Sequence, residues 1–172
     1  MNERTSSRQR RATAARIGFA GLVLAGSLAT TGLAAPGPMH LEVEDASAGR
    51  HVLCLGVEPG EEFEVEFFHS YDKFPFREFY RVERVGQIVT ARMVFRAVLN
   101  GQGYVYPGLR VREDGWAVID GIEEANPRVE FLMGSPDFAN HRIRVGGSTY
   151  ALTRWIEPGS LVQVEAKAGS CP

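Results

Sequence analysis

The stretch from Phe67 to Tyr80 holds the side chains in this chain that are best suited to chemistry. It reads FFHSYDKFPFREFY and places His69 and Glu78 on either side of a turn. Imidazole and carboxylate groups can transfer protons, form hydrogen bonds or hold a ligand. If His69 lies opposite Phe76 in a hairpin, Glu78 becomes its diagonal neighbour on the same face, with Cα atoms about 7–8 Å apart. We therefore expect both polar side chains to lie together on an otherwise apolar, inward face.

Two interpretations of this pair are open from the sequence. In the first, His69 and Glu78 form a structural hydrogen bond that fixes the register, because burying both unpaired costs several kcal/mol. In the second, they bind a ligand or an ion, and Ser70, Asp72 and Lys73 line the adjacent loop. A Ser–His–Asp triad is not expected, because neighbours in one turn point apart. A metal site would need a third protein ligand, for which Asp72 is the nearest candidate, but the spacing matches no strong metal motif, and the sequence predicts no metal and no cofactor.

A glycine-rich aromatic segment at residues 100–108 is the second candidate. Gly101 and Gly103 allow close approach of the backbone, and Tyr104 could cover a small ligand. The alternative is a plain connection with aromatic plugs. His141 is expected to be a strand-end histidine without a role. The predicted ligand-binding residues are His69, Ser70, Asp72, Lys73, Glu78, Tyr80, Gly101, Gly103 and Tyr104.

Short strands separated by glycine and proline turns must position these residues. Apolar and polar side chains alternate over residues 63–69, 76–83 and 89–96, as in half-buried strands. Further strands are predicted at residues 51–57, 116–119, 129–133, 142–145, 148–152 and 161–166. We therefore expect an all-β domain over residues 50–172, an antiparallel sandwich or open barrel of eight or nine strands. Residues 36–49 precede it as an acidic lead-in.

Residues 1–35 have the pattern of an export signal. Five arginines precede an uncharged apolar stretch at residues 17–33, and the small residues Ala34 and Ala35 follow. The alternative is an uncleaved membrane anchor, but the stretch is short and rich in glycine, serine and threonine. We therefore expect a signal peptide and a periplasmic or otherwise extracytoplasmic domain.

Removal of that segment changes the charge of the protein. Lysine plus arginine falls from 19 to 14 and aspartate plus glutamate from 21 to 20, which gives a net charge of −6 instead of −2. An acidic surface argues against nucleic acid as a partner. The two cysteines, Cys54 and Cys171, could pair in an oxidising compartment, or both could stay free thiols.

The same polar hairpin carries a family resemblance. The run EVEFFHSYDKFPFREFY resembles the signature of the domain of unknown function 1850 family, and HRIRVGGSTYAL resembles its closing hairpin. The element from Gly101 to Pro107 is similar to the family's glycine-rich loop, with one extra residue before the proline. Tyr71 departs from the small aliphatic residue usual after His-Ser. The resemblance covers roughly residues 50–166, and the positions that match its signature are His69, Ser70, Pro75, Glu78 and Tyr80.

The resemblance implies an exported or membrane-associated bacterial protein without an established activity. Members often occur beside TRAP-type transporters whose binding protein belongs to the TAXI class. This favours a non-enzymatic accessory or binding protein, with a small solute, a substrate-binding protein or a membrane subunit as its partner. Two alternatives are an exported hydrolase-like enzyme that uses His69 and Glu78 as acid and base, and a structural envelope protein without a small ligand.

Overall fold

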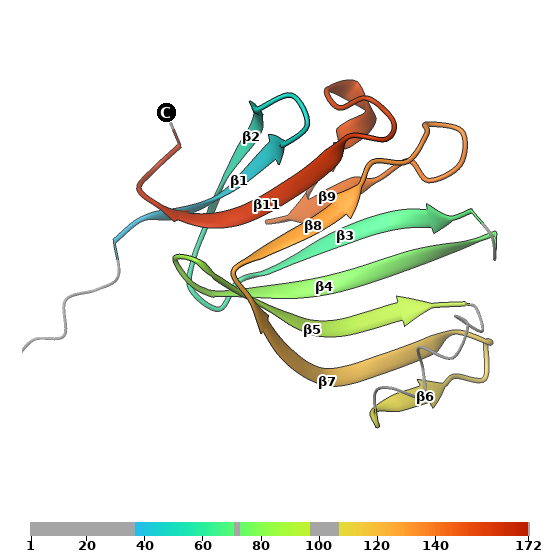
Figure 1. Ribbon diagram of the computed structural model, residues 1–172. Coiled ribbons are helices and arrows are strands. Elements are labelled where there is room, and N and C mark those ends of the chain that lie inside the picture. Colours follow the sequence, from blue (N-terminus) through green and yellow to red (C-terminus); the bar gives the residue numbers. More distant parts are fainter. Residues whose placement is uncertain (1–36, 71–72, 97–106, 172) are drawn as a thin grey trace, which may run out of the picture. The chain divides into compact units, whose positions relative to one another are not determined.

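Eleven β-strands build the part of the chain that the structure describes. The computed structural model describes residues 37–70, 73–96 and 107–171. Its strands form two antiparallel sheets (Figure 1). The expected all-β antiparallel fold is confirmed as a sandwich-like arrangement without a closed barrel. The count exceeds the predicted eight or nine because Met39–Asp45 (β1) and Leu109–Val111 (β6) are also strands.

The smaller sheet has four strands in the order β2-β1-β11-β8. They are Arg50–Val57 (β2), Met39–Asp45 (β1), Leu161–Ala168 (β11) and Arg128–Leu132 (β8). Half of the predicted acidic lead-in over residues 36–49 is the strand β1, which lies in the sheet between β2 and β11. Leu41 and Val43 of β1 are fully buried. On the opposite face Glu42 lies 2.6 Å from His51 Nδ1 and 3.0 Å from Lys167 Nζ, so neighbouring strands offset its charge.

The larger sheet has seven strands in the order β10-β9-β3-β4-β5-β7-β6. Besides β6, they are Ser148–Ala151 (β10), Arg142–Val145 (β9), Glu62–His69 (β3), Phe74–Arg84 (β4), Gln87–Phe95 (β5) and Ala117–Asn126 (β7). Every predicted strand has a counterpart, although β7 runs well past the predicted end at residue 119. The described members of the predicted binding site lie either in this sheet, at His69, Glu78 and Tyr80, or in its β3–β4 turn, at Ser70 and Lys73.

A continuous apolar core joins the two sheets. Leu41 and Val164 of the smaller sheet belong to the same buried cluster as Phe63, Val65 and Ile143 of the larger one. Burial of such side chains stabilises each by about 1.5–3 kcal/mol relative to exposure, which makes this cluster the main source of stability. A second, smaller cluster, formed by Phe76, Phe95, Ala117 and Ile119, lies on the larger sheet.

Helical structure is limited to one short turn in the described ranges. It is the 3-10 helix Leu152–Arg154 (η2), which follows β10. Within the same ranges, no helix has the length and apolar character needed to cross a membrane.

Candidate functional site

The β3–β4 hairpin has a different register from the predicted one. His69 pairs with Phe74, and Val65 pairs with Glu78, so the register is shifted by two residues. A shift of two keeps every side chain on its predicted face, because side chains alternate with a period of two. It also leaves His69 and Glu78 four pairing positions apart, about 13 Å at 3.3–3.4 Å per residue. The predicted His69–Glu78 pair does not form.

The physical reason is the length of the turn. The sequence predicts a turn over residues 70–75 because Pro75 has no amide hydrogen to donate to a neighbouring strand. In the structure β4 begins at Phe74, and Pro75 lies within the ladder opposite Phe68. The connection is therefore two residues shorter than expected, and the pairing moves accordingly.

Glu78 forms its described hydrogen bond with another predicted residue, Tyr80. The Tyr80 hydroxyl donates to Glu78 Oε2 at 2.8 Å, and the Tyr80 ring stacks on Phe63 at 5.2 Å between centroids. Glu78 is half-buried between Val65 and Met93 on the neighbouring strands. Burial raises the pKa of the Glu78 carboxyl, and the hydrogen bond from Tyr80 opposes this rise. Glu78 and Tyr80 therefore form a polar pair within the sheet, and His69 lies too far along β3 to join it.

The remaining described residues of the predicted site lie at the hairpin tip. The Lys73 amide donates to the His69 carbonyl at 2.8 Å and closes the turn, with Lys73 at a φ of 59°. The Lys73 ammonium lies 5.1 Å from the centre of the Phe138 ring. Ser70 is the first residue of the turn after β3. Four predicted residues, Asp72, Gly101, Gly103 and Tyr104, lie outside the described residues.

A groove of about 380 Å³ lies beside this tip, between the hairpin and the segment before β9. Phe68, Pro75 and Phe138 give it apolar walls, and Arg142 and Asn140 add polar groups. Phe68 and Phe138 are 36% and 55% exposed to solvent, which is unusually high for phenylalanine. The volume falls within the range of about 300–1,000 Å³ that is usual for small-molecule sites.

Backbone hydrogen bonds hold the wall of this groove in place. The Phe68 amide donates to the Ala139 carbonyl at 2.8 Å, which ties the segment to β3. The Ser135 carbonyl accepts from the amides of residues 138–140 at 3.0–3.2 Å. A Cβ at Gly134 would lie only 2.1 Å from Ala139 Cβ, so this compact turn requires glycine there. The groove is therefore formed before any ligand arrives.

His141 supports the groove from below, and its importance is missed in the sequence. Its ring stacks between Phe67 and Phe131, with centroids 5.1 and 4.9 Å away. Nδ1 accepts a hydrogen bond from the Gly134 amide at 3.2 Å. Burial lowers the pKa of His141 to about 4. The available signal was its alternation with Ile143 and Val145, which places it on the inward face.

The outward face of the larger sheet carries a charge network that the sequence analysis does not single out. Arg77 binds Glu64 through two hydrogen bonds of 2.7 and 2.6 Å. Arg144 lies 3.4 Å from Glu64 and 3.1 Å from Glu66, and Arg142 lies 3.5 Å from Glu66. The signal was present in the alternation of Glu64 and Glu66 with apolar residues, opposite the outward arginines of β4 and β9.

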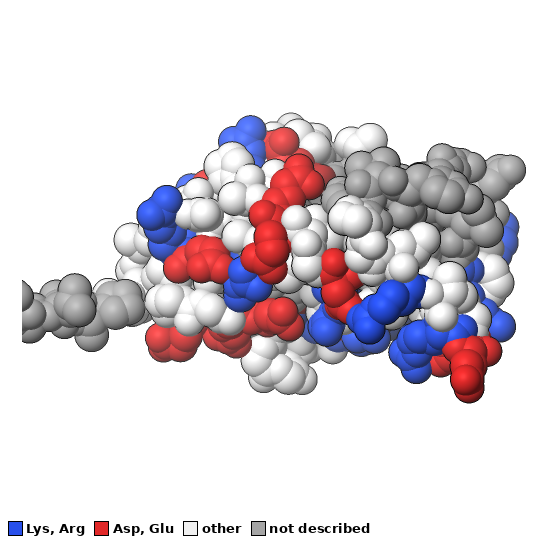
Figure 2. Space-filling model, turned by 90° about the horizontal axis from the view of Figure 1, so that it is seen from below, with Lys and Arg blue, Asp and Glu red and all other residues white. Residues whose placement is uncertain are grey.

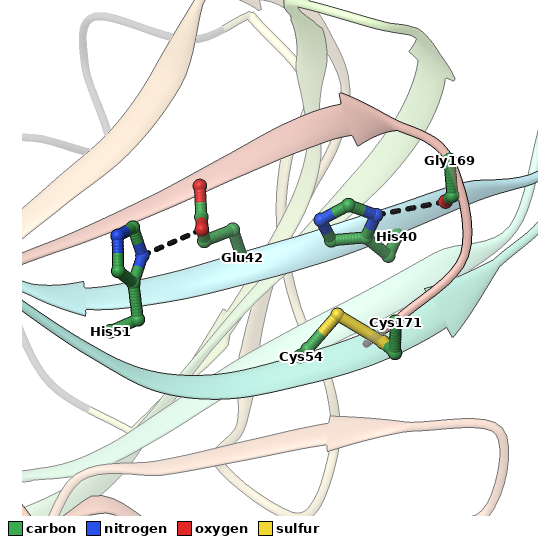
Figure 3. The surroundings of a disulfide bond; sticks show 6 residues. All are labelled: His40, Glu42, His51, Cys54, Gly169 and Cys171. Atoms are coloured by element: carbon green, nitrogen blue, oxygen red, sulfur yellow. Dashed lines mark hydrogen bonds and ion pairs between the residues drawn. A yellow bond between two sulfur atoms is a disulfide. The ribbon is translucent and has the colours of Figure 1, made fainter.

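The two cysteines form a disulfide, one of the two outcomes left open by the sequence. Cys54 in β2 and Cys171 in the C-terminal tail have Cα atoms 5.5 Å apart, within the normal range (Figure 3). His40 Nδ1 lies 2.9 Å from the Gly169 carbonyl and also holds the tail. The bridge is on the outward face of the smaller sheet, away from the groove.

Among the described residues, no group of three or more His, Cys, Asp or Glu side chains could hold a metal ion. Comparison with known proteins identifies a family for this chain. A model of the family described as Domain of unknown function (DUF1850) matches residues 63–152, just over half of the chain. No curated protein and no solved structure matches. The matched segment contains nearly all of the seven-stranded sheet and the groove, whereas Cys54 and Cys171 lie outside it.

Proposed function

We propose a binding function for this chain, which belongs to the domain of unknown function 1850 family. In this proposal it is an exported accessory protein that holds a small solute in the groove beside the β3–β4 turn. The solute has an apolar body and a polar end. The protein then serves a solute transporter of the TRAP type with a TAXI-class binding protein, as the family resemblance suggests.

The observation that carries the proposal is that two exposed phenylalanines line a groove whose backbone is held in place by hydrogen bonds. Phe68 and Phe138 remain partly exposed across a groove whose wall is tied to β3 by the Phe68–Ala139 hydrogen bond. Preformed walls lower the ordering cost of binding. Arg142 and Glu66, which lie 3.5 Å apart, and Asp137 supply charged groups to the lining of the groove. Such a site suits an amphipathic solute better than a macromolecule, because the groove is small.

Two observations support placement outside the cytoplasm. The Cys54–Cys171 bridge is of a kind that persists in oxidising compartments and is rare in the cytosol. The first 35 residues carry the basic, apolar and small-residue regions of an export signal. An exported domain would meet solutes on the side of the membrane where a transporter collects them.

A thermal-shift screen of the purified protein tests the binding proposal. The probes are amino acids with apolar side chains and short-chain carboxylic acids. A ligand at 100 times its Kd should add about 2.7 kcal/mol to the free energy of unfolding and raise the Tm. Phe138→Ala should remove the shift, because it deletes one wall of the groove. Val85→Ala is the matched control, since Val85 is also an exposed apolar residue, 49% exposed, but lies in the β4–β5 turn.

A flat response to every probe would favour the structural envelope protein instead. A shift that survives Phe138→Ala would place binding elsewhere on the molecule. The transporter role has its own test, in which the tagged protein is purified from native membranes and solute uptake is measured in a deletion strain. Absence of any transport component together with unchanged uptake would refute that role.

A further inference from the structure

A second groove, on the outward face of the seven-stranded sheet, gathers four arginines. It has a volume of about 450 Å³, and it shares no lining residue with the groove beside the turn. Figure 2 shows basic side chains gathered toward the right of that view, the end where β6 lies, while acidic ones are more frequent to the left. The residues that line this arginine groove are Arg77, Phe79, Arg92, Val94, Arg110, Arg112, Val118 and Asp120.

The strand register explains why these side chains meet. Phe79 pairs with Arg92, Arg92 pairs with Asp120, and Val118 pairs with both Val94 and Arg110. Residues directly opposite each other in an antiparallel sheet point to the same face. Four neighbouring strands therefore place an apolar floor, formed by Phe79, Val94 and Val118, beneath a rim of guanidinium groups.

The arginines differ in how far carboxylates neutralise them. Arg77 is bound by both oxygens of Glu64. Arg110 pairs with Asp120, and Arg112 lies 2.8 Å from Asp114. Among the described residues, the carboxylate contact of Arg92 is a longer one, 3.8 Å to Glu62. Arg92 is therefore the least compensated cation of the rim.

Arg92 also carries an unsatisfied donor. Its Nε is buried, and it is the only such side-chain atom without a hydrogen-bond partner in the described part of the chain. Its guanidinium lies 4.0 Å from the centre of the Phe79 ring, which fixes the plane of the fork over the apolar floor. Buried donors normally have a partner, so the described protein groups leave the Arg92 guanidinium only partly satisfied, and its side chain is 38% exposed.

We infer that the arginine groove binds an organic anion, with a carboxylate on Arg92 and the carbon skeleton on Val94 and Val118. The guanidinium fork matches the geometry of a carboxylate, and the apolar floor would be of no use to an inorganic anion. Four arginines face one lining acid here, although the chain beyond residue 35 carries a net charge of −6. The site goes beyond the proposed function, because it uses different residues and can exist whether or not the other groove binds a solute.

Calorimetric titration of the purified protein with benzoate, benzamide and inorganic phosphate tests this inference. Benzoate should bind, and its affinity should fall at high ionic strength. Benzamide, which lacks the charge, and phosphate, which lacks the apolar body, should bind more weakly than benzoate. Arg92→Gln should lower the affinity for benzoate at least about tenfold, because a hydrogen bond between charged groups is lost. The benzoate affinity of Arg92→Lys should lie between those of the wild type and Arg92→Gln, since lysine keeps the charge but lacks the forked guanidinium.

Two further variants separate binding from folding. Arg112→Gln removes a side chain that is 59% exposed, so it should fold normally and still weaken benzoate. Arg154→Gln, an exposed arginine in η2 outside the groove, should bind like the wild type. Equal affinity for benzoate and benzamide, unchanged affinity in both groove variants, or no benzoate binding would overturn the inference. Phe138→Ala should leave benzoate binding intact, which separates this site from the one beside the turn.

Discussion

A histidine ring stacked between two aromatic rings responds to protons unlike one at the surface. Protonation of His141 would place a cation between Phe67 and Phe131 and would turn Nδ1 into a donor facing the Gly134 amide. Two donors would then face each other across 3.2 Å. Burial already lowers the pKa of His141 to about 4, so the folded protein holds it neutral at physiological pH.

This gives the stability of the domain a pH dependence with a definite sign. Between pH 6.5 and about 4 the unfolded chain binds a proton at His141 that the folded chain does not. The free energy of unfolding should therefore fall as pH falls through that window, by up to about 3 kcal/mol at 1.36 kcal/mol per pKa unit. Urea denaturation at a series of pH values measures the slope.

His141→Gln should flatten this dependence, since glutamine does not titrate. His51→Gln is the control, because the His51 side chain is 69% exposed and should leave the slope unchanged. Glu78, whose pKa is raised by burial, contributes the opposite slope, with stability lost as pH rises above 4.5. It is present in every protein compared, so its contribution cancels. Identical slopes in wild type and His141→Gln would contradict the assignment.

At the scale of the strand, alternation predicts faces but not registers. The period of two places Phe67, His69, Phe76 and Glu78 on one face, and the structure agrees. The register depends on the length of the turn. Pro75 lacks an amide hydrogen and was expected in the turn, but it belongs to β4, so the turn is shorter than the sequence indicates. A shift of two costs nothing in burial, because every side chain keeps its face. The two strands of the hairpin were therefore predicted correctly, whereas the predicted contact between His69 and Glu78 was wrong.

Strand β1 shows the other limit of a local pattern. Its outward Glu42 looks like part of a solvated acidic segment, because its two partners are remote in sequence. His51 lies in β2, and Lys167 lies in the last strand, β11. Only the folded sheet brings these charges together. The same holds for the arginine groove, whose residues come from four strands.

The edge strand β6 depends on a close approach at Gly108. A Cβ at that position would lie 2.3 Å from the Asp120 carbonyl oxygen in β7. Gly108→Ala should therefore displace β6, separate Arg110 from Asp120 and cost about 1–3 kcal/mol of stability, as overpacking does. Hydrogen exchange should show lost protection at the β6–β7 ladder.

Gly56→Ala provides the matched glycine control, because a Cβ there meets nothing within 4 Å. It should leave both exchange and stability nearly unchanged. Gly108→Ala should also lower the affinity for benzoate, since Arg110 lies in the displaced strand β6 and Arg112 follows directly after it. Full protection of the β6 amides in Gly108→Ala would show that the strand tolerates the extra methyl group.

At the scale of the whole molecule, the disulfide closes nearly the entire domain into one loop. Cys54 and Cys171 are 117 residues apart, and the loop contains nine of the eleven strands in full, from β3 to β11. The bridge joins the edge strand β2 to the tail after β11, and β1 lies between them in the sheet. It therefore holds the smaller sheet together while it restricts the unfolded chain.

Removing the bridge should destabilise the protein as a unit. The chain-entropy model gives about 4–5 kcal/mol for a loop of this length, an upper figure for Cys54→Ser combined with Cys171→Ser. A thiol reductant should lower the Tm of the wild type toward that of the double variant, and it should leave the variant itself unchanged. A reductant-insensitive wild type with the Tm of the double variant would show that the cysteines do not pair. Because a reducing compartment would withhold this stabilisation, the same measurement tests whether the domain depends on export to reach its full stability.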